Sequence, residues 1–146
     1  MNKVWIVLLS IFVSCSNPVD TAHEGIELAL VDKLQLTELS RGGNVDTVTL
    51  NSNALQTFFK VRARVNNQSY TQQKVYWYSN DYWYVYFVNK LEKVPIINQA
   101  SYVTDDGYAY NMGAVNIQLQ GRTVTIYGYY EKYNTRYIDS VKIYVN

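Results

Sequence analysis

The sequence predicts an all-β fold, an antiparallel β-sandwich with an immunoglobulin-like or related arrangement of about nine or ten short strands. Apolar and polar residues alternate along most of the chain, and turn signals separate the runs at short intervals. No stretch has the apolar spacing of an amphipathic helix. A compact β-barrel is the alternative, because the same alternation is compatible with a closed sheet.

A membrane-spanning barrel is a further alternative, since alternation with aromatic girdles is its signature. The long run from Leu55 to Val65 argues against it, because three charges, Lys60, Arg62 and Arg64, lie on its polar side. The same three charges are more simply interpreted as a solvated strand face than as a track for phosphates.

The N-terminus carries Lys3, then ten mostly apolar residues from Val4 to Val13, then Ser14 and the single cysteine, Cys15. This pattern is typical of a secretory signal and is too short to cross a bilayer as a helix. The four residues Phe12-Val13-Ser14-Cys15 resemble the lipobox of bacterial lipoproteins. An ordinary secretory signal with a chance cysteine is the alternative.

The lipoprotein resemblance implies cleavage before Cys15 and lipid on its sulfur, so that the chain is anchored to a membrane. Residues 1–14 would be the signal peptide, residues 15–25 the lipidated cysteine and tether, and residues 26–146 a single β domain. Ser16 after the cysteine favours the outer membrane under the enterobacterial sorting rule. No disulfide is then available, so packing must stabilise the domain.

The charge of the chain is balanced, with 13 basic and 12 acidic residues. Loss of Lys3 with the signal would make the two counts equal. A balanced surface gives no electrostatic reason to expect nucleic acid as a partner.

Strand signals begin at Ile26, where Ile26, Leu28 and Leu30 alternate with polar residues, and they recur at Leu34 and Leu36. A turn is expected at residues 40–43 and a short strand at Val48 and Leu50. The run Leu55–Val65 predicts a long half-buried strand, its apolar side carrying Leu55, Thr57, Phe59, Val61, Ala63 and Val65.

The most aromatic stretch, Val75–Val88, predicts a hairpin with a three-residue loop at Ser79-Asn80-Asp81. Such pairing places side chains of one kind on each face of the hairpin. One face would carry Val75, Trp77, Trp83, Val85 and Phe87, and the other Tyr76, Tyr78, Tyr82, Tyr84 and Tyr86.

The stretch Lys90–Gln99 has little strand character, and one helical turn is expected before Pro95. Asp105-Asp106-Gly107 predicts a hairpin turn between Tyr102 and Tyr108. A second hairpin is expected around Gly121-Arg122, pairing Leu119 with Val124, Ile117 with Ile126 and Val115 with Gly128. Alternation from Val141 to Val145 predicts a C-terminal strand.

The residues give little support for catalysis. His23 is the only histidine and lies in the predicted tether, where it cannot be held as a general base, and too few Cys or His residues exist for a zinc site. A glycosidase-like carboxylate pair is the one catalytic alternative, from Glu92, Glu131, Asp105, Asp106 and Asp139. No cofactor or metal is expected, and Asp105-Asp106-Gly107 is interpreted as a turn because it lacks the EF-hand pattern.

The 15 tyrosines are the one feature above background. Tyrosine offers large, stiff, amphipathic contact area, so a face rich in it favours binding of a glycan or of another envelope protein. The candidate binding residues are Tyr76, Tyr78, Tyr82, Tyr84, Tyr86, Tyr127 and Tyr129. The competing interpretation is that strand propensity alone places these residues, with the chain a structural subunit of an envelope assembly.

Overall fold

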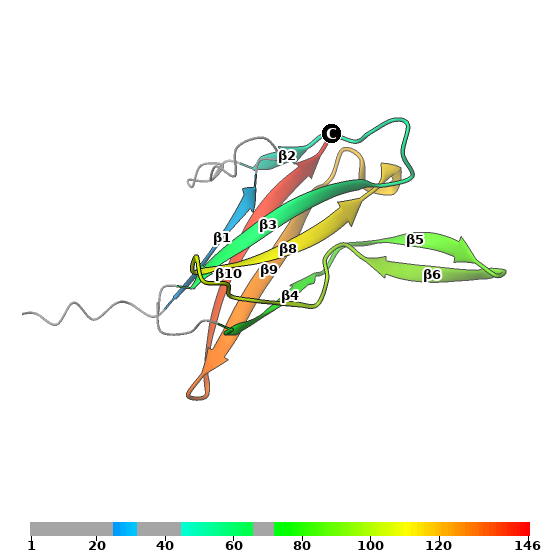
Figure 1. Ribbon diagram of the computed structural model, residues 1–146. Helices are drawn as coiled ribbons and strands as arrows, with labels where there is room; N and C mark the ends of the chain where they lie inside the picture. Colours follow the sequence, from blue (N-terminus) through cyan, green and yellow to red (C-terminus); the bar gives the residue numbers. More distant parts are fainter. Residues whose placement is uncertain (1–24, 32–44, 66–71) are drawn as a thin grey trace, which may run out of the picture.

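The computed structural model describes residues 25–31, 45–65 and 72–146. These residues form an all-β, sandwich-like fold, which confirms the predicted fold class (Figure 1). The strands are β1 (Ile26–Val31), β2 (Asp46–Val48), β3 (Thr57–Val65), β4 (Lys74–Ser79), β5 (Tyr82–Phe87), β6 (Lys90–Pro95), β7 (Ala100–Tyr102), β8 (Tyr108–Val115), β9 (Thr123–Lys132) and β10 (Thr135–Val145), with one 3₁₀ turn, η1 (Ile117–Leu119).

The strands form a three-stranded sheet of order β1-β3-β8, a five-stranded sheet of order β2-β10-β9-β4-β7, and a two-stranded hairpin of β5 and β6. All pairs are antiparallel except β2 with β10, which is parallel. The two larger sheets enclose one apolar core, while the β5–β6 hairpin projects to one side (Figure 1).

Alternation predicted the core side of the long strands correctly. In β3 the residues Thr57, Phe59, Val61, Ala63 and Val65 are buried, and in β10 Val141, Ile143 and Val145 are buried. The prediction that Leu55 lies on this face is wrong. Strand β3 begins only at Thr57, and Leu55 before it is 95% exposed. Ile26, Leu28 and Leu30 are buried in β1, as predicted.

The predicted Val75–Val88 hairpin is wrong. Strand β4 pairs with β9 and β7, whereas β5 pairs with β6 and leaves the sandwich. Trp77 and Trp83 are buried as predicted, but Val85 and Phe87 are exposed because β5 has no second sheet above it beyond Trp83.

Two further local pairings differ from the prediction. Strand β8 pairs with β3 rather than β9, and η1 occupies the residues expected to pair across Gly121-Arg122. Lys90–Pro95 is a strand, not a helical turn, and its charges suit an exposed edge. The turn at Asp105-Asp106-Gly107 is confirmed, with Gly107 in the left-handed region at φ +82° and its N–H donating to the Thr104 carbonyl.

One close approach joins β3 and β8. Phe59 lies opposite Gly113, and a Cβ at Gly113 would stand 2.2 Å from the Phe59 Cζ atom. Glycine therefore provides the space for the buried ring to cross the neighbouring strand.

The two sheets also meet along β1 and β10. The Leu28 N–H donates to Oδ2 of Asp139 at 2.8 Å, so a carboxylate of one sheet satisfies a backbone group of the other. Among the described residues no helix has the length and apolar character needed to span a membrane. The predicted signal peptide, Cys15, the tether, Leu34, Leu36 and the turn at residues 40–43 lie outside the described residues, apart from Gly25.

Candidate functional site

The outer side of the five-stranded sheet carries a group of tyrosines, here called the tyrosine face. Strand alternation turns Val75, Trp77 and Ile126 into the core, so their neighbours in sequence point outward. The tyrosine face comprises Tyr76, Tyr78, Tyr102, Tyr127 and Tyr129, from β4, β7 and β9.

Cross-strand register builds the tyrosine face. Tyr76 is paired with Tyr129 and Tyr78 with Tyr127, which brings residues about 50 positions apart in sequence directly opposite one another. The rings of Tyr76 and Tyr129 stack with centroids 5.2 Å apart, and those of Tyr78 and Tyr127 at 4.8 Å. Tyr78 also meets Tyr129 edge to face at 6.2 Å.

Cations bracket the stacked rings. The Arg136 guanidinium lies 4.4 Å from the Tyr129 ring centroid, and Lys74 Nζ lies 4.8 Å from that of Tyr76. Arg136 donates to Oε1 of Glu131 at 2.7 and 3.0 Å, and this hydrogen bond raises the pKa of the guanidinium. At Tyr129 the row of rings therefore ends beside the positive guanidinium of Arg136, which is paired with the negative carboxylate of Glu131.

The stacking determines which parts of the rings face solvent. Tyr129 lies between Tyr76 on β4 and Arg136 on β10, so both of its faces are occupied. Tyr76 and Tyr78 are still 36% and 39% exposed, and Tyr102 at the sheet edge is 55% exposed. Tyr129, at the centre of the tyrosine face, thus offers its ring edge and hydroxyl group rather than an open ring face.

The other three candidate tyrosines lie elsewhere, which corrects the prediction that all five residues from Tyr76 to Tyr86 share one face. Tyr82, Tyr84 and Tyr86 belong to the projecting β5–β6 hairpin. Tyr82 and Tyr84 meet edge to face at 5.3 Å, and a hydrogen bond with Tyr82 raises the pKa of the Tyr84 hydroxyl. Tyr86 is 71% exposed.

Two side chains fasten the hairpin to the sandwich. Gln118 of η1 donates from Nε2 to the Tyr84 carbonyl at 2.8 Å, and its Oε1 accepts from the Tyr84 N–H at 3.0 Å. The Trp83 indole donates to the Ala114 carbonyl at 3.3 Å.

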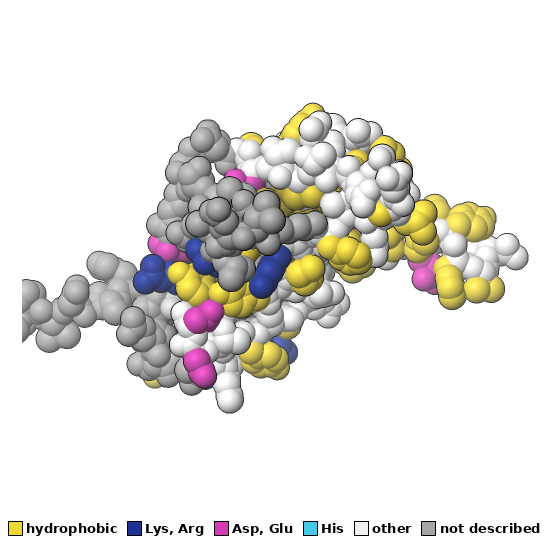
Figure 2. All heavy atoms as spheres, turned by 45° about the horizontal axis from the view of Figure 1, so that its top comes forward, with side chains coloured by type: hydrophobic (Ala, Val, Ile, Leu, Met, Phe, Trp, Pro, Cys, Tyr) yellow, Lys and Arg dark blue, Asp and Glu magenta, His cyan; other side chains and the backbone are white. Residues whose placement is uncertain are grey.

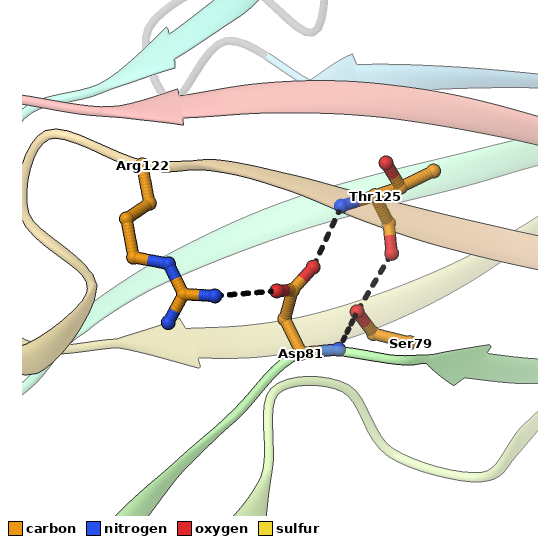
Figure 3. A network of polar contacts seen from close by, with 4 residues as sticks. All are labelled: Ser79, Asp81, Arg122 and Thr125. Atoms are coloured by element: carbon orange, nitrogen blue, oxygen red, sulfur yellow. Dashed lines mark hydrogen bonds and ion pairs between the residues drawn. The ribbon is translucent and has the colours of Figure 1, made fainter.

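A polar joint connects β4 to β5 where the sequence suggested a hairpin loop. Ser79 Oγ donates to the Thr125 carbonyl, and Asp81 Oδ2 accepts from the Thr125 N–H (Figure 3). Asp81 also bonds Arg122 at 3.3 Å, from the turn that precedes β9. The joint occupies backbone groups of β9 at the point where β4 departs, and so holds the base of the hairpin.

A shallow apolar groove of about 660 Å³ runs between the hairpin and the sandwich. Leu55, Phe58, Val85, Tyr86 and Ile117 line it, and all five are exposed. Apolar side chains gather near the projecting hairpin in the space-filling view (Figure 2). Sequence reasoning missed this groove, because it assigned Leu55, Val85 and Ile117 to the core.

Apart from Asp105 and Asp106, which share one turn, the carboxylates considered for catalysis lie on different elements. Glu131 bonds Arg136, Asp139 accepts from the Leu28 N–H, and Glu92 lies on the hairpin. Asp106 accepts from Thr104, Tyr108 and Tyr110 within its own turn. Despite partial desolvation, which opposes ionisation, these hydrogen bonds lower the pKa of Asp106. In the described ranges no three Asp, Glu, His or Cys side chains are grouped as metal ligands would be.

Comparison with known proteins identifies no family. No family model and no curated protein matches the chain. One solved structure that it resembles distantly is that of a DUF4466 family protein from Parabacteroides merdae ATCC 43184, with 10% sequence identity and a TM-score of 0.35. The alignment covers 82% of this chain and 43% of that protein, so the chain spans less than half of the other's length.

Proposed function

We propose that this chain is a non-catalytic, lipid-anchored binding module of a bacterial envelope, and that it docks a partner protein on the tyrosine face. The observation that carries the proposal is the pair of cross-strand stacks, Tyr76 with Tyr129 and Tyr78 with Tyr127, on the exposed side of the sheet. Stacking fixes the rings before any partner arrives, so little conformational entropy is lost on binding.

The chemistry of the tyrosine face favours protein over glycan. Sugar rings bind aromatic side chains by lying flat on a ring face, whereas here Tyr129 has both faces occupied by Tyr76 and Arg136. Ring edges, hydroxyls and the paired charges of Arg136 and Glu131 suit a protein surface with mixed polar and apolar contacts.

The anchor in this proposal comes from the N-terminal sequence. The lipobox-like residues Phe12-Val13-Ser14-Cys15 supply the lipidation site, and two or more acyl chains hold a protein stably at a membrane. Anchoring would keep the module at the envelope, where a partner protein is met repeatedly.

Photo-crosslinking in cells tests the proposed docking surface. A photoreactive phenylalanine analogue replaces Tyr102, which lies at the edge of the tyrosine face and is 55% exposed. We expect one discrete crosslinked product of defined mass. Adding Tyr78→Ser and Tyr127→Ser should abolish that product, because the two changes together remove the Tyr78–Tyr127 stack.

The control places the same analogue at Met112, an exposed position on β8 of the other sheet. This position should give no such product. An equal product from Met112, or a Tyr102 product that survives loss of the stack, would contradict docking on the tyrosine face. A glycan array bound by the wild-type chain and not by the stack variant would instead assign the face to sugar.

A further inference from the structure

The free edge of β6 is the strongest unexplained feature outside the tyrosine face. Within the described part of the chain β6 pairs with β5 alone. The side chains of Lys90, Leu91, Glu92 and Lys93 are all exposed. An uncovered strand edge of this kind has unpaired backbone groups that can pair with a strand of another chain.

The hydrogen bonds of Gln118 reveal which backbone groups of the hairpin point outward. Both polar backbone groups of Tyr84 bond Gln118, so Tyr84 and its partner Lys93 do not bond each other. Antiparallel pairs alternate, so the pair Tyr86 with Leu91 is also not hydrogen-bonded. The N–H and C=O of Leu91 therefore point away from β5, to the open edge.

The turn of the hairpin leads to the same assignment independently. Val88 and Asn89 form a two-residue turn with φ of 46° and 60°. The residues flanking such a turn, Phe87 and Lys90, form a hydrogen-bonded pair. Alternation again leaves Leu91 facing the open edge.

We propose that two copies of this chain associate through their β6 edges, antiparallel and related by a two-fold axis at Leu91. The outward backbone groups of Leu91 then bond those of Leu91 in the second copy. Lys90 of each copy lies opposite Glu92 of the other, giving two cross-strand charge pairs and a four-stranded sheet, β5-β6-β6-β5.

The charges select this register over its neighbours. Moving the two-fold axis by one residue places Lys90 opposite Lys90, or Glu92 opposite Glu92, and a move of two residues toward the base of the hairpin places Lys93 opposite Lys93. Like charges directly opposite on adjacent strands are destabilising. Of these four registers, the one centred on Leu91 alone opposes charges of unlike sign.

The same register also covers apolar surface. Tyr86 and Leu91 are opposite one another on one face of the hairpin and are 71% and 55% exposed. Pairing at Leu91 continues this row across the interface into Leu91 and Tyr86 of the second copy. Val88 at the tip of the hairpin is 82% exposed and has a positive φ. A positive φ is unfavourable for a β-branched residue, so valine at this position does not stabilise the isolated chain.

A charge-swap series tests the proposal on the full chain in detergent micelles at low ionic strength. Light scattering on a size-exclusion column measures the protein mass over a concentration series. We expect a dimer for the wild type. Lys90→Glu or Glu92→Lys alone should weaken it about tenfold, because both charge pairs become repulsive.

Restoration distinguishes pairing from a general charge effect. An equimolar mixture of the Lys90→Glu chain and the Glu92→Lys chain should recover the dimer, and so should the double variant carrying both changes. Control changes of the same sign away from the edge, Lys142→Glu on β10 and Asp105→Lys in the turn before β8, should leave the mass unchanged.

A wild-type chain that stays monomeric at every concentration would overturn the proposal. So would single variants that dimerise like the wild type, a mixture that stays monomeric, or control variants that weaken the dimer equally. Association with an unrelated protein in place of a second copy would also count against it.

Discussion

The side chain of Gln118 occupies both polar backbone groups of Tyr84, as a neighbouring strand would. A single amide thus substitutes for one residue of a sheet, and it joins the η1 turn to the projecting hairpin. Ser79 and Asp81 do the same for Thr125 on β9. Side chains therefore complete the backbone hydrogen bonding at both points where the regular ladder ends.

Replacing Gln118 by Ala is expected to loosen the base of the hairpin without unfolding the sandwich. The free energy of unfolding should fall by about 1 kcal/mol, because two exposed hydrogen bonds are lost. Amide hydrogen exchange should show the Tyr84 N–H losing its protection. Gln120→Ala, an exposed glutamine two residues on, is the control and should leave this protection unchanged.

Gly113→Ala is expected to destabilise the protein by about 2 kcal/mol, because the added Cβ overlaps the buried Phe59 ring. Denaturant unfolding measures the change. In a double-mutant cycle, Phe59→Leu should cost less in the Gly113→Ala background than in the wild type. Equal costs in both backgrounds would show that the two residues are not coupled.

The turn before β8 should make stability sensitive to acid through Asp106. Its pKa is lower in the folded state than in the unfolded chain, so its contribution is complete above the unfolded value of about 3.9 and disappears as the pH falls through the folded value. Asp106→Asn should therefore lower the melting temperature at pH 7 and have less effect at pH 2. A uniform decrease across this range would contradict ionisation of Asp106 as the cause.

Tyrosines on the two surfaces should differ in their effect on stability. Tyr76→Ser should lower the free energy of unfolding by about 1 kcal/mol, since it removes a stacked ring from Tyr129. Tyr86→Ser should change it by less than about 0.5 kcal/mol, because that side chain is 71% exposed. Thermal unfolding of the two variants side by side checks the contrast, which equal losses would refute.

Cys15→Ala should abolish incorporation of a labelled fatty acid into the chain in a bacterial host. Cys15 is the single cysteine of the sequence and the last residue of the lipobox-like segment. Ser14→Ala, which keeps a small residue before the cysteine, is the comparison and should retain label. Labelling that persists after Cys15→Ala would refute the anchor.

Alternation in the sequence predicts which face of a strand is buried more reliably than it predicts which strand lies beside it. The buried sides of β3 and β10 were predicted residue by residue, since each strand is covered on one side only. The outward direction of Tyr76 and Tyr78 is the same whether β4 pairs with β5 or with β9. Their true partners, Tyr129 and Tyr127, are distant in sequence, and no local signal indicates that pairing.

The errors concentrate where the chain leaves the sandwich. Lys90–Pro95 lacks an apolar run because an edge strand of a projecting hairpin buries little. Val85 and Phe87 looked like core residues because their pattern matched Trp83, yet only Trp83 is buried. Apolar residues used for contact and apolar residues used for the core have the same appearance in a sequence.

The outer half of the β5–β6 hairpin extends beyond the last attachments of Trp83 and Tyr84 to the sandwich (Figure 1). From Tyr86 to Leu91 every side chain is exposed, so none of these residues contributes to the central core. The segment is therefore modular. Another hairpin tip of matching length could be grafted onto the same base, changing what the protein contacts while its fold stays the same.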